Sequence, residues 1–148
     1  MYYSLGEYNQ AKELHEKALK TCKKIFGEDH ADVATSYNNL ASVYKDLGEY
    51  NQAKELYEKA LMIREKIFGE DHAHVATSYT KLAVVYYSLK EYNQAKELYE
   101  KALMIGKQIC GDDHEYLERI RNELALVNKQ LVGSLPEDRE EKARCLIL

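Results

Sequence analysis

Three histidines recur at one spacing in this chain, and histidine is a common ligand for metal ions. His30 and His72 each close the tetrapeptide GEDH, and His114 closes GDDH, so the separation is 42 residues both times (72 − 30 = 114 − 72 = 42). The ligands of one ion must all lie about 2 Å from it, whereas equivalent side chains of stacked repeats lie several ångströms apart. We therefore expect these histidines to cap helices or fix loops, and we expect no metal site.

Cysteine offers a second kind of chemistry, as a thiol, a metal ligand or a point of lipid attachment. The chain has three cysteines, Cys22, Cys110 and Cys145, and no C-x-x-C pair. This odd number without that spacing argues against a disulfide framework or a zinc knuckle, so reduced thiols are expected. The final four residues, CLIL, begin at Cys145 and fit a prenylation signal that would tether the chain to a membrane. The alternative is an apolar tip that folds onto the preceding helix or stays disordered.

No group of residues with a catalytic spacing is found in the sequence. A nucleophile with a partner base and a glycine-rich phosphate loop are both missing, and the many carboxylates are spread among lysines. Glu55 and Lys59, for example, are spaced to pair across one turn of an exposed helix. The sequence predicts a protein that is not an enzyme, uses no cofactor and has no small-molecule substrate.

The histidines belong to a longer repeat that must position them. The segment EYNQAKELYEKAL occurs at Glu49–Leu61 and at Glu91–Leu103, and it occurs at Glu7–Leu19 with His15 in place of its second tyrosine. The copies again start 42 residues apart (49 − 7 = 91 − 49 = 42). A fixed period of this size predicts a stacked array of helical units rather than one globular core. His15 is expected simply to pack.

Composition agrees with an all-helical array. The 148 residues carry a formal charge of −4 and include a single proline, Pro136, so nothing interrupts helices before that point. An acidic chain has no general attraction for phosphate backbones, and we expect no nucleic-acid partner. No apolar run is long enough to cross a bilayer, and the N-terminus lacks the features of a signal peptide, which predicts a cytoplasmic protein.

The period divides the chain into units. The array is predicted over residues 1–132, as a partial unit 1–30, two full units 31–72 and 73–114, and a cap helix 115–132, with a charged tail and apolar tip over 133–148. The partial unit lacks its leading helix, which favours a fragment of a longer array.

Each full unit predicts two antiparallel helices, because apolar residues recur at spacings of three and four. Asp29 or His30 is expected to cap the first helix, Gly48 to end it, and Asn51 to cap the second. Lys90 stands where the next unit needs that glycine, which predicts a less relaxed turn.

The full unit also carries the signature positions of a known repeat. With a second set 42 residues later, the chain resembles the tetratricopeptide-repeat family, although the family's usual unit has about 34 residues. The longer unit, with ALMIREKIFGEDH at Ala60–His72, is similar to the kinesin light chain and nephrocystin-3-like subfamily. The signature positions are occupied by Tyr37, Leu40, Ala41, Tyr44, Leu47, Gly48, Tyr50, Ala53, Tyr57 and Ala60.

This resemblance implies an all-α, right-handed superhelical solenoid of antiparallel hairpins with a C-terminal capping helix. It also implies a non-catalytic adaptor, in which the first helices of the units line a concave groove for an extended peptide of a protein partner. In kinesin light chains such grooves take acidic motifs with an aromatic or leucine anchor.

The residues of the first helices that lie outside the buried stripe are predicted to face the groove. The copied units differ mainly here: Asn38 becomes Thr80 in the next unit, and Asn39 becomes Lys81. Asparagine can bond a peptide backbone through both donor and acceptor, and lysine can hold acidic side chains. The predicted groove consists of Thr35, Asn38, Asn39, Ser42, Lys45, Thr77, Thr80, Lys81, Val84, Tyr87, Arg119 and Asn122.

Several alternatives remain open at the level of sequence. The variable positions could be solvated residues that drift freely. Asn39 and Lys81 suggest the carboxylate clamp of chaperone-binding relatives, but the unit that would supply its other members is missing. The chain could also self-associate through its first unit, as a dimer or an end-to-end stack, or act as a membrane-tethered adaptor prenylated at Cys145.

Overall fold

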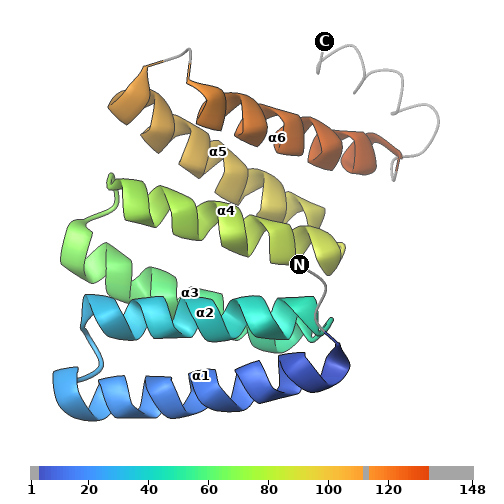
Figure 1. Cartoon of the computed structure of the whole chain (residues 1–148). Coiled ribbons are helices and arrows are strands. Elements are labelled where there is room, and N and C mark those ends of the chain that lie inside the picture. Colours follow the sequence, from blue (N-terminus) through green and yellow to red (C-terminus); the bar gives the residue numbers. More distant parts are fainter. Residues whose placement is uncertain (1–3, 112–113, 134–148) are drawn as a thin grey trace.

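The computed structural model describes residues 4–111 and 114–133. These residues form α-helices without any strand, and consecutive helices stack side by side as antiparallel neighbours (Figure 1). The prediction of an all-α array of helix hairpins is therefore confirmed. The tail and Cys145 lie outside the described residues. The helices are α1 (Leu5–Phe26), α2 (Ala31–Asp46), α3 (Tyr50–Phe68), α4 (Ala73–Ser88), α5 (Tyr92–Cys110) and α6 (Glu115–Gly133).

Helix α1 begins earlier than its copies do. The Ser4 hydroxyl accepts a hydrogen bond from the Glu7 amide (3.3 Å), and the Glu7 carboxylate accepts one from the Ser4 amide (2.6 Å). This reciprocal capping box satisfies two free donors at the helix start. The helix consequently runs through Gly6, although the repeat aligns Gly6 with the turn residue Gly48.

The recurring histidines cap helices, as predicted. The Nδ1 atoms of His30, His72 and His114 accept hydrogen bonds from the backbone amide two residues later, at 3.1, 3.1 and 3.2 Å. Phe26 stacks on the His30 ring and Phe68 on the His72 ring, with centroids 4.3 and 4.4 Å apart. His30 and His72 thus join the end of one helix to the start of the next, whereas Cys110 stands at the equivalent of Phe26 and Phe68 before His114.

The turns inside the two hairpins share one geometry. Gly48 has a φ of 79°, and the equivalent Lys90 has a φ of 62°. After each, the next amide donates to a carbonyl in the last helical turn, that of Tyr44 or Tyr86, at 2.9 Å. This pattern needs a left-handed residue, which glycine adopts freely and lysine only with strain. The less relaxed turn at Lys90 is confirmed.

The predicted cap at Asn51 is wrong. Helix α3 already begins at Tyr50, and its N-cap, Glu49, makes no side-chain cap hydrogen bond. The physical reason is that the left-handed turn leads directly into the next helix, so Glu49 is not in the extended conformation that N-caps usually adopt.

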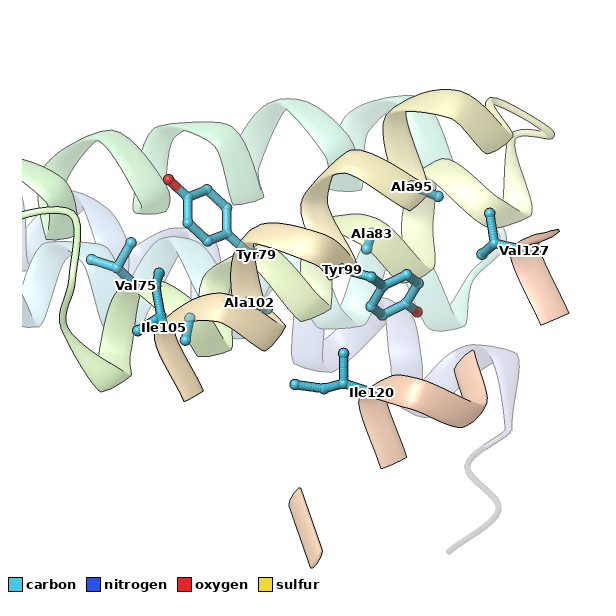
Figure 2. Close-up of a cluster of buried hydrophobic side chains, with 10 residues drawn as sticks. Val75, Tyr79, Ala83, Ala95, Tyr99, Ala102, Ile105, Ile120 and Val127 are labelled. Atoms are coloured by element: carbon cyan, nitrogen blue, oxygen red, sulfur yellow. The ribbon is translucent and has the colours of Figure 1, made fainter. Parts of the chain in front are cut away.

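Small residues let the helices approach at their crossings. Ala41, Ala53 and Ala60 have no exposed surface, and neither do their copies Ala83, Ala95 and Ala102. Larger side chains fill the space around them. Figure 2 shows the buried cluster formed by α4, α5 and α6, to which Tyr79, Tyr99, Ile120 and Val127 belong.

A repeated set of contacts, the tyrosine clip, joins successive units. The Tyr44 hydroxyl donates to Glu16 (3.0 Å), and its copy Tyr86 donates to Glu58 (2.8 Å). Lys12 and Lys54 lie over these two rings, 4.9 and 5.4 Å from the centroids. At the third interface the equivalent of the two tyrosines is Asn128, so no ring is available there.

Helix α6 has one buried face and one polar face. Leu117, Ile120, Val127 and Val132 are buried, whereas Arg121 stands at the position equivalent to Tyr79 and is only partly buried. Within the described part of the chain, no helix combines the length and apolarity that a membrane span requires.

Candidate peptide-binding groove

Helices α4 and α6 are the first helices of consecutive units, and they enclose a hollow of about 360 Å³. Tyr99 of α5 also lines it. Five of the predicted groove residues line this hollow, and four further residues complete it. The predicted ones are Thr77, Thr80, Lys81, Val84 and Arg119, and the others are Tyr99, Tyr116, Ile120 and Glu123.

The floor of the hollow is apolar and aromatic. Tyr99 and Ile120 are almost fully buried, while Val84 is 36% exposed at the opening. Burial, followed by the charge of Glu123, raises the pKa of Tyr99, so that this phenol stays neutral at any physiological pH. Burial also raises the pKa of Tyr116. The hollow can therefore receive an apolar or aromatic side chain.

Its rim is charged. Lys81 on α4 and Glu123 on α6 are equivalent positions of successive units, and Arg119 joins them on the α6 side. The rim thus presents two cations and one carboxylate around the apolar floor.

A polar network lies at the adjacent crossing, between α2 and α4. Arg64 of α3 donates from Nη1 to the Ser78 hydroxyl at 2.8 Å. When the Asn38 amide is oriented to satisfy both groups, its oxygen accepts from Nη1 and Nη2 of Arg64 at 2.8 and 3.0 Å. Burial lowers the pKa of the Arg64 guanidinium, although it remains a cation.

This network corrects the prediction for Asn38. The Asn38 side chain is only 4% exposed, so it hydrogen-bonds to Arg64 and is not available to a peptide. The helical pattern placed Asn38 outside the apolar stripe, but it did not show that a long arginine from α3 would reach over it.

Three cations gather at this crossing. Partial burial, then Arg64 and then Lys45 lower the pKa of Lys81, so both of these charges lie close enough to Lys81 to act on it. Arg64 was missed by sequence reasoning, which looked for groove residues on the first helices alone. The sequence did contain a sign of its importance, because this position differs among the copies although the rest of the helix changes little. The equivalent residues are Cys22, Arg64 and Gly106.

The remaining predicted residues are more scattered. Thr35 bonds its own helix, with its hydroxyl donating to the Ala31 carbonyl at 3.2 Å, while Asn39 and Asn122 are exposed. The Ser42 hydroxyl lies 2.7 Å from the Tyr57 hydroxyl. Tyr87 meets the Tyr92 ring edge to face, with centroids 5.4 Å apart.

The comparisons with known proteins agree with this geometry. A family model described as tetratricopeptide repeat matches residues 1–66, 32–108 and 74–135. The crystal structure of BtubC (BKLC) from P. vanneervenii is similar, with a TM-score of 0.79 and 30% identity over 96% of this chain. The chain spans 58% of the length of that protein. No curated protein matches.

Two further crystal structures share the fold. Both show a putative kinesin light chain with nearly identical TPR-like repeats from Podosopora anserina, one of them as a variant with a single substitution. Their TM-scores are 0.76 and 0.75, each at 22% identity over 95% of this chain and 81% or 80% of theirs. The chain therefore belongs to the tetratricopeptide-repeat family, and its array has the fold of kinesin light chain-like repeats.

Proposed function

We propose that the chain is an adaptor module that binds an extended, acidic peptide of a protein partner along the faces of α2, α4 and α6. Tetratricopeptide repeats typically serve as scaffolds for protein interactions. The observation that carries the proposal is the placement of a cationic cluster next to an apolar hollow in one groove. The cluster consists of Lys45, Arg64 and Lys81.

The hollow supplies the anchor. A ligand-sized cavity with an apolar floor and few polar groups at its rim is typical of a binding site. Tyr99, Tyr116 and Ile120 form a floor of the size and polarity that suit a tryptophan, tyrosine, phenylalanine or leucine side chain.

The cationic cluster supplies the charge preference. Among the described residues, Arg64 hydrogen-bonds to Asn38 and Ser78, which are neutral, so they orient its guanidinium without neutralising it. Like charges at close range repel, and burial weakens hydration, so a carboxylate from a ligand would relieve both costs. Lys81 borders both regions, which favours a peptide with acidic residues next to its anchor.

The test is a binding screen against a library of labelled acidic peptides, each with one tryptophan, tyrosine, phenylalanine or leucine. Affinity of the selected peptides is then measured by fluorescence anisotropy for two variants. Lys81→Ala removes charge, and Val84→Glu blocks the mouth of the hollow. Each is expected to weaken binding at least about tenfold, or about 1.4 kcal/mol.

Matched controls lie on exposed positions of the second helices, away from the groove. Lys59→Ala on α3 removes a lysine, and Met104→Glu on α5, where the methionine is 57% exposed, introduces the same carboxylate as Val84→Glu. Both should bind like the parent chain. Selected peptides that bind Lys81→Ala and Val84→Glu at parental affinity would refute the groove, as would a screen that selects no peptide.

A further inference from the structure

A hollow of about 300 Å³ is enclosed by the second helices α1 and α3, and it shares no lining residue with the hollow of the proposed groove. Its apolar lining comes from Tyr37 of α2 and from Met62 and Ile63 of α3. Three lysines and two carboxylates complete it, so cations are in excess, and we call it the lysine hollow. The charged residues are Lys23, Lys59, Lys66, Glu28 and Asp29.

The same place in the next unit, between α3 and α5, holds a carboxylate that belongs to the chain itself. The Tyr79 hydroxyl donates a hydrogen bond to Glu65 at 2.8 Å, and the Lys101 ammonium lies 5.7 Å from the centre of the Tyr79 ring. Burial and then the hydrogen bond to Glu65 raise the pKa of Tyr79, and the charges of Glu65, Glu70 and Asp71 raise it further. A tyrosine hydroxyl beneath a lysine is thus a site where a carboxylate binds.

In the lysine hollow a cation replaces this carboxylate. Lys23 stands at the position equivalent to Glu65, and Lys66 stands where the next unit has a glutamine. The Lys23 and Lys59 ammoniums lie 5.0 and 5.8 Å from the centre of the Tyr37 ring. Tyr37 therefore keeps a lysine over its ring, as Tyr79 does, but it lacks the equivalent carboxylate partner.

The three lysines of the hollow have ion-pair partners that a ligand can displace. In each pair the carboxylate is at least 63% exposed, and exposed pairs contribute little to stability. The pairs are Lys23 with Glu28 (4.0 Å), Lys66 with Asp29 (3.4 Å) and Lys59 with Glu55 (3.6 Å).

The regular array leaves this position open. Helices α3 and α5, which flank the equivalent site, each pack against a first helix on both sides. Lys101 and Met104 nevertheless stay exposed there. A site at this place is therefore reachable even where neighbouring helices are present on each side.

From the missing carboxylate at Tyr37, we propose that the lysine hollow binds a carboxylate side chain from an acidic segment of a protein partner. The partner's carboxylate accepts a hydrogen bond from Tyr37, as Glu65 does from Tyr79, and the lysines balance its charge. A carboxylate suits the hollow better than a phosphate group, because Glu28 and Asp29 repel a doubly charged ligand more strongly. The site lies outside the groove, so it does not depend on the proposed function.

The test is an NMR titration of the full, isotope-labelled chain with the acetylated and amidated tetrapeptide Ala-Glu-Glu-Ala, which has no anchor residue for the groove. The amide signals of Tyr37, Lys59 and Ile63 are expected to shift, and the glutamine version of the peptide should leave them in place. Lys23→Glu supplies the carboxylate from within, as in the copy, and should weaken this binding at least about tenfold.

The matched control is Lys24→Glu, which makes the same change of charge on an exposed neighbour outside the hollow. It should alter the affinity by less than about twofold. Circular dichroism checks that both variants stay helical, and α3 already carries a glutamate at the position equivalent to Lys23. Equal binding by Lys23→Glu and Lys24→Glu would overturn the proposal, as would a Tyr37 signal that the peptide does not move in the parent chain.

A gain of binding is expected in the copied site. Glu65→Lys with Gln108→Lys gives the α3–α5 site the lysines of the lysine hollow, and the peptide should then shift the Tyr79 amide signal. An unmoved Tyr79 signal would count against the proposal, and so would inorganic phosphate that shifts the Tyr37 signal at a lower concentration than the peptide. Lys81→Ala in the groove should leave the binding at Tyr37 unchanged, so this test and that of the groove can fail separately.

Discussion

The two crossings along the groove are built from copied helices, yet they differ in chemistry. At the α2–α4 crossing, Arg64 reaches from α3 to Asn38 and Ser78. At the α4–α6 crossing, the equivalents of these three residues are Gly106, Thr80 and Ile120. The first crossing is therefore polar and filled, while the second is apolar and holds the hollow.

Residue 106 shows how one position changes a whole crossing. A Cβ atom on Gly106 would come within 2.5 Å of the Leu117 side chain, so any larger residue at this position would have to displace this leucine of α6. Leu117 itself takes the place of the smaller Val33 and Val75. A single difference on the second helices, Arg64 against Gly106, therefore accompanies the change from a polar crossing to an apolar one.

The largest loss of stability is expected from Gly106→Arg. This substitution places at the α4–α6 crossing the arginine that the α2–α4 crossing has at the equivalent position 64. The introduced side chain would collide with Leu117 and bring a charge into an apolar site that lacks the Asn38 and Ser78 partners. Overpacking and an unpaired buried charge should together cost at least about 3 kcal/mol in the free energy of unfolding. Urea denaturation followed by circular dichroism measures it.

A milder pair of variants isolates the packing part. Gly106→Ala should destabilise by about 1 kcal/mol once its better helix propensity is counted. Adding Leu117→Val, which restores the residue of the other units, should recover much of that loss. If the double variant were no more stable than Gly106→Ala, contact with Leu117 would not be the reason for glycine here.

The next largest effect concerns the first crossing. Arg64→Ala leaves the Asn38 amide buried without its partner, which should cost about 1 to 3 kcal/mol in the free energy of unfolding. Lys66→Ala, on an exposed residue of the same helix, is the control and should change stability by less than about 0.5 kcal/mol. Equal stability of the two variants in urea denaturation would contradict the buried network.

A smaller effect is expected at high pH, where the tyrosine clip titrates. Burial and then the hydrogen bond to Glu58 raise the pKa of Tyr86 to about 12 from its ordinary value of 10.0. Because the folded pKa is the higher one, this stabilisation is complete below pH 10 and is lost between about pH 10 and 12. Tyr86→Phe should therefore show a shallower loss of melting temperature over that range than the parent chain, and an equal slope would argue against the clip.

The smallest effect compares two equivalent lysines. Lys54 lies over the Tyr86 ring and 3.7 Å from the Glu91 carboxylate, whereas Lys96, in the part of the chain that the structure describes, pairs with Glu100 on its own helix at 4.0 Å. Lys54→Ala should cost up to about 1 kcal/mol, and Lys96→Ala only a few tenths. Thermal melts of the two variants side by side would test this, and a larger loss in Lys96→Ala would mean that the missing ring at Asn128 is unimportant.

Local chemistry explains which structural predictions succeeded. The helix caps and the hairpin turns depend on a few neighbouring residues, and each occurs in more than one unit. The caps are at His30 and His72, and the turns are at Gly48 and Lys90. The cap at Asn51 failed because the length of the turn, not the residue type, set the helix start. Helix α1 begins earlier than its copies, at a capping box formed by Ser4 and Glu7.

The lining of the hollow could be predicted only in part. Thr80, Lys81 and Arg119 were expected to share one surface because of their position on the first helices, and they line the hollow. Arg64 was not, because a sequence pattern assigns a residue to a face of its own helix and says nothing about how far a long side chain extends to the next one. Asn38 was misplaced for the same reason.

The sequence by itself determined the number and order of the helices, their stacking into units and their family. The reason is that the same apolar spacing, helix caps and turn residues recur every 42 residues. Only the tertiary structure decided which crossing is polar and which one holds the hollow. These features depend on contacts between residues of different units, such as Arg64 with Ser78 and Gly106 with Leu117, and no single unit contains both partners.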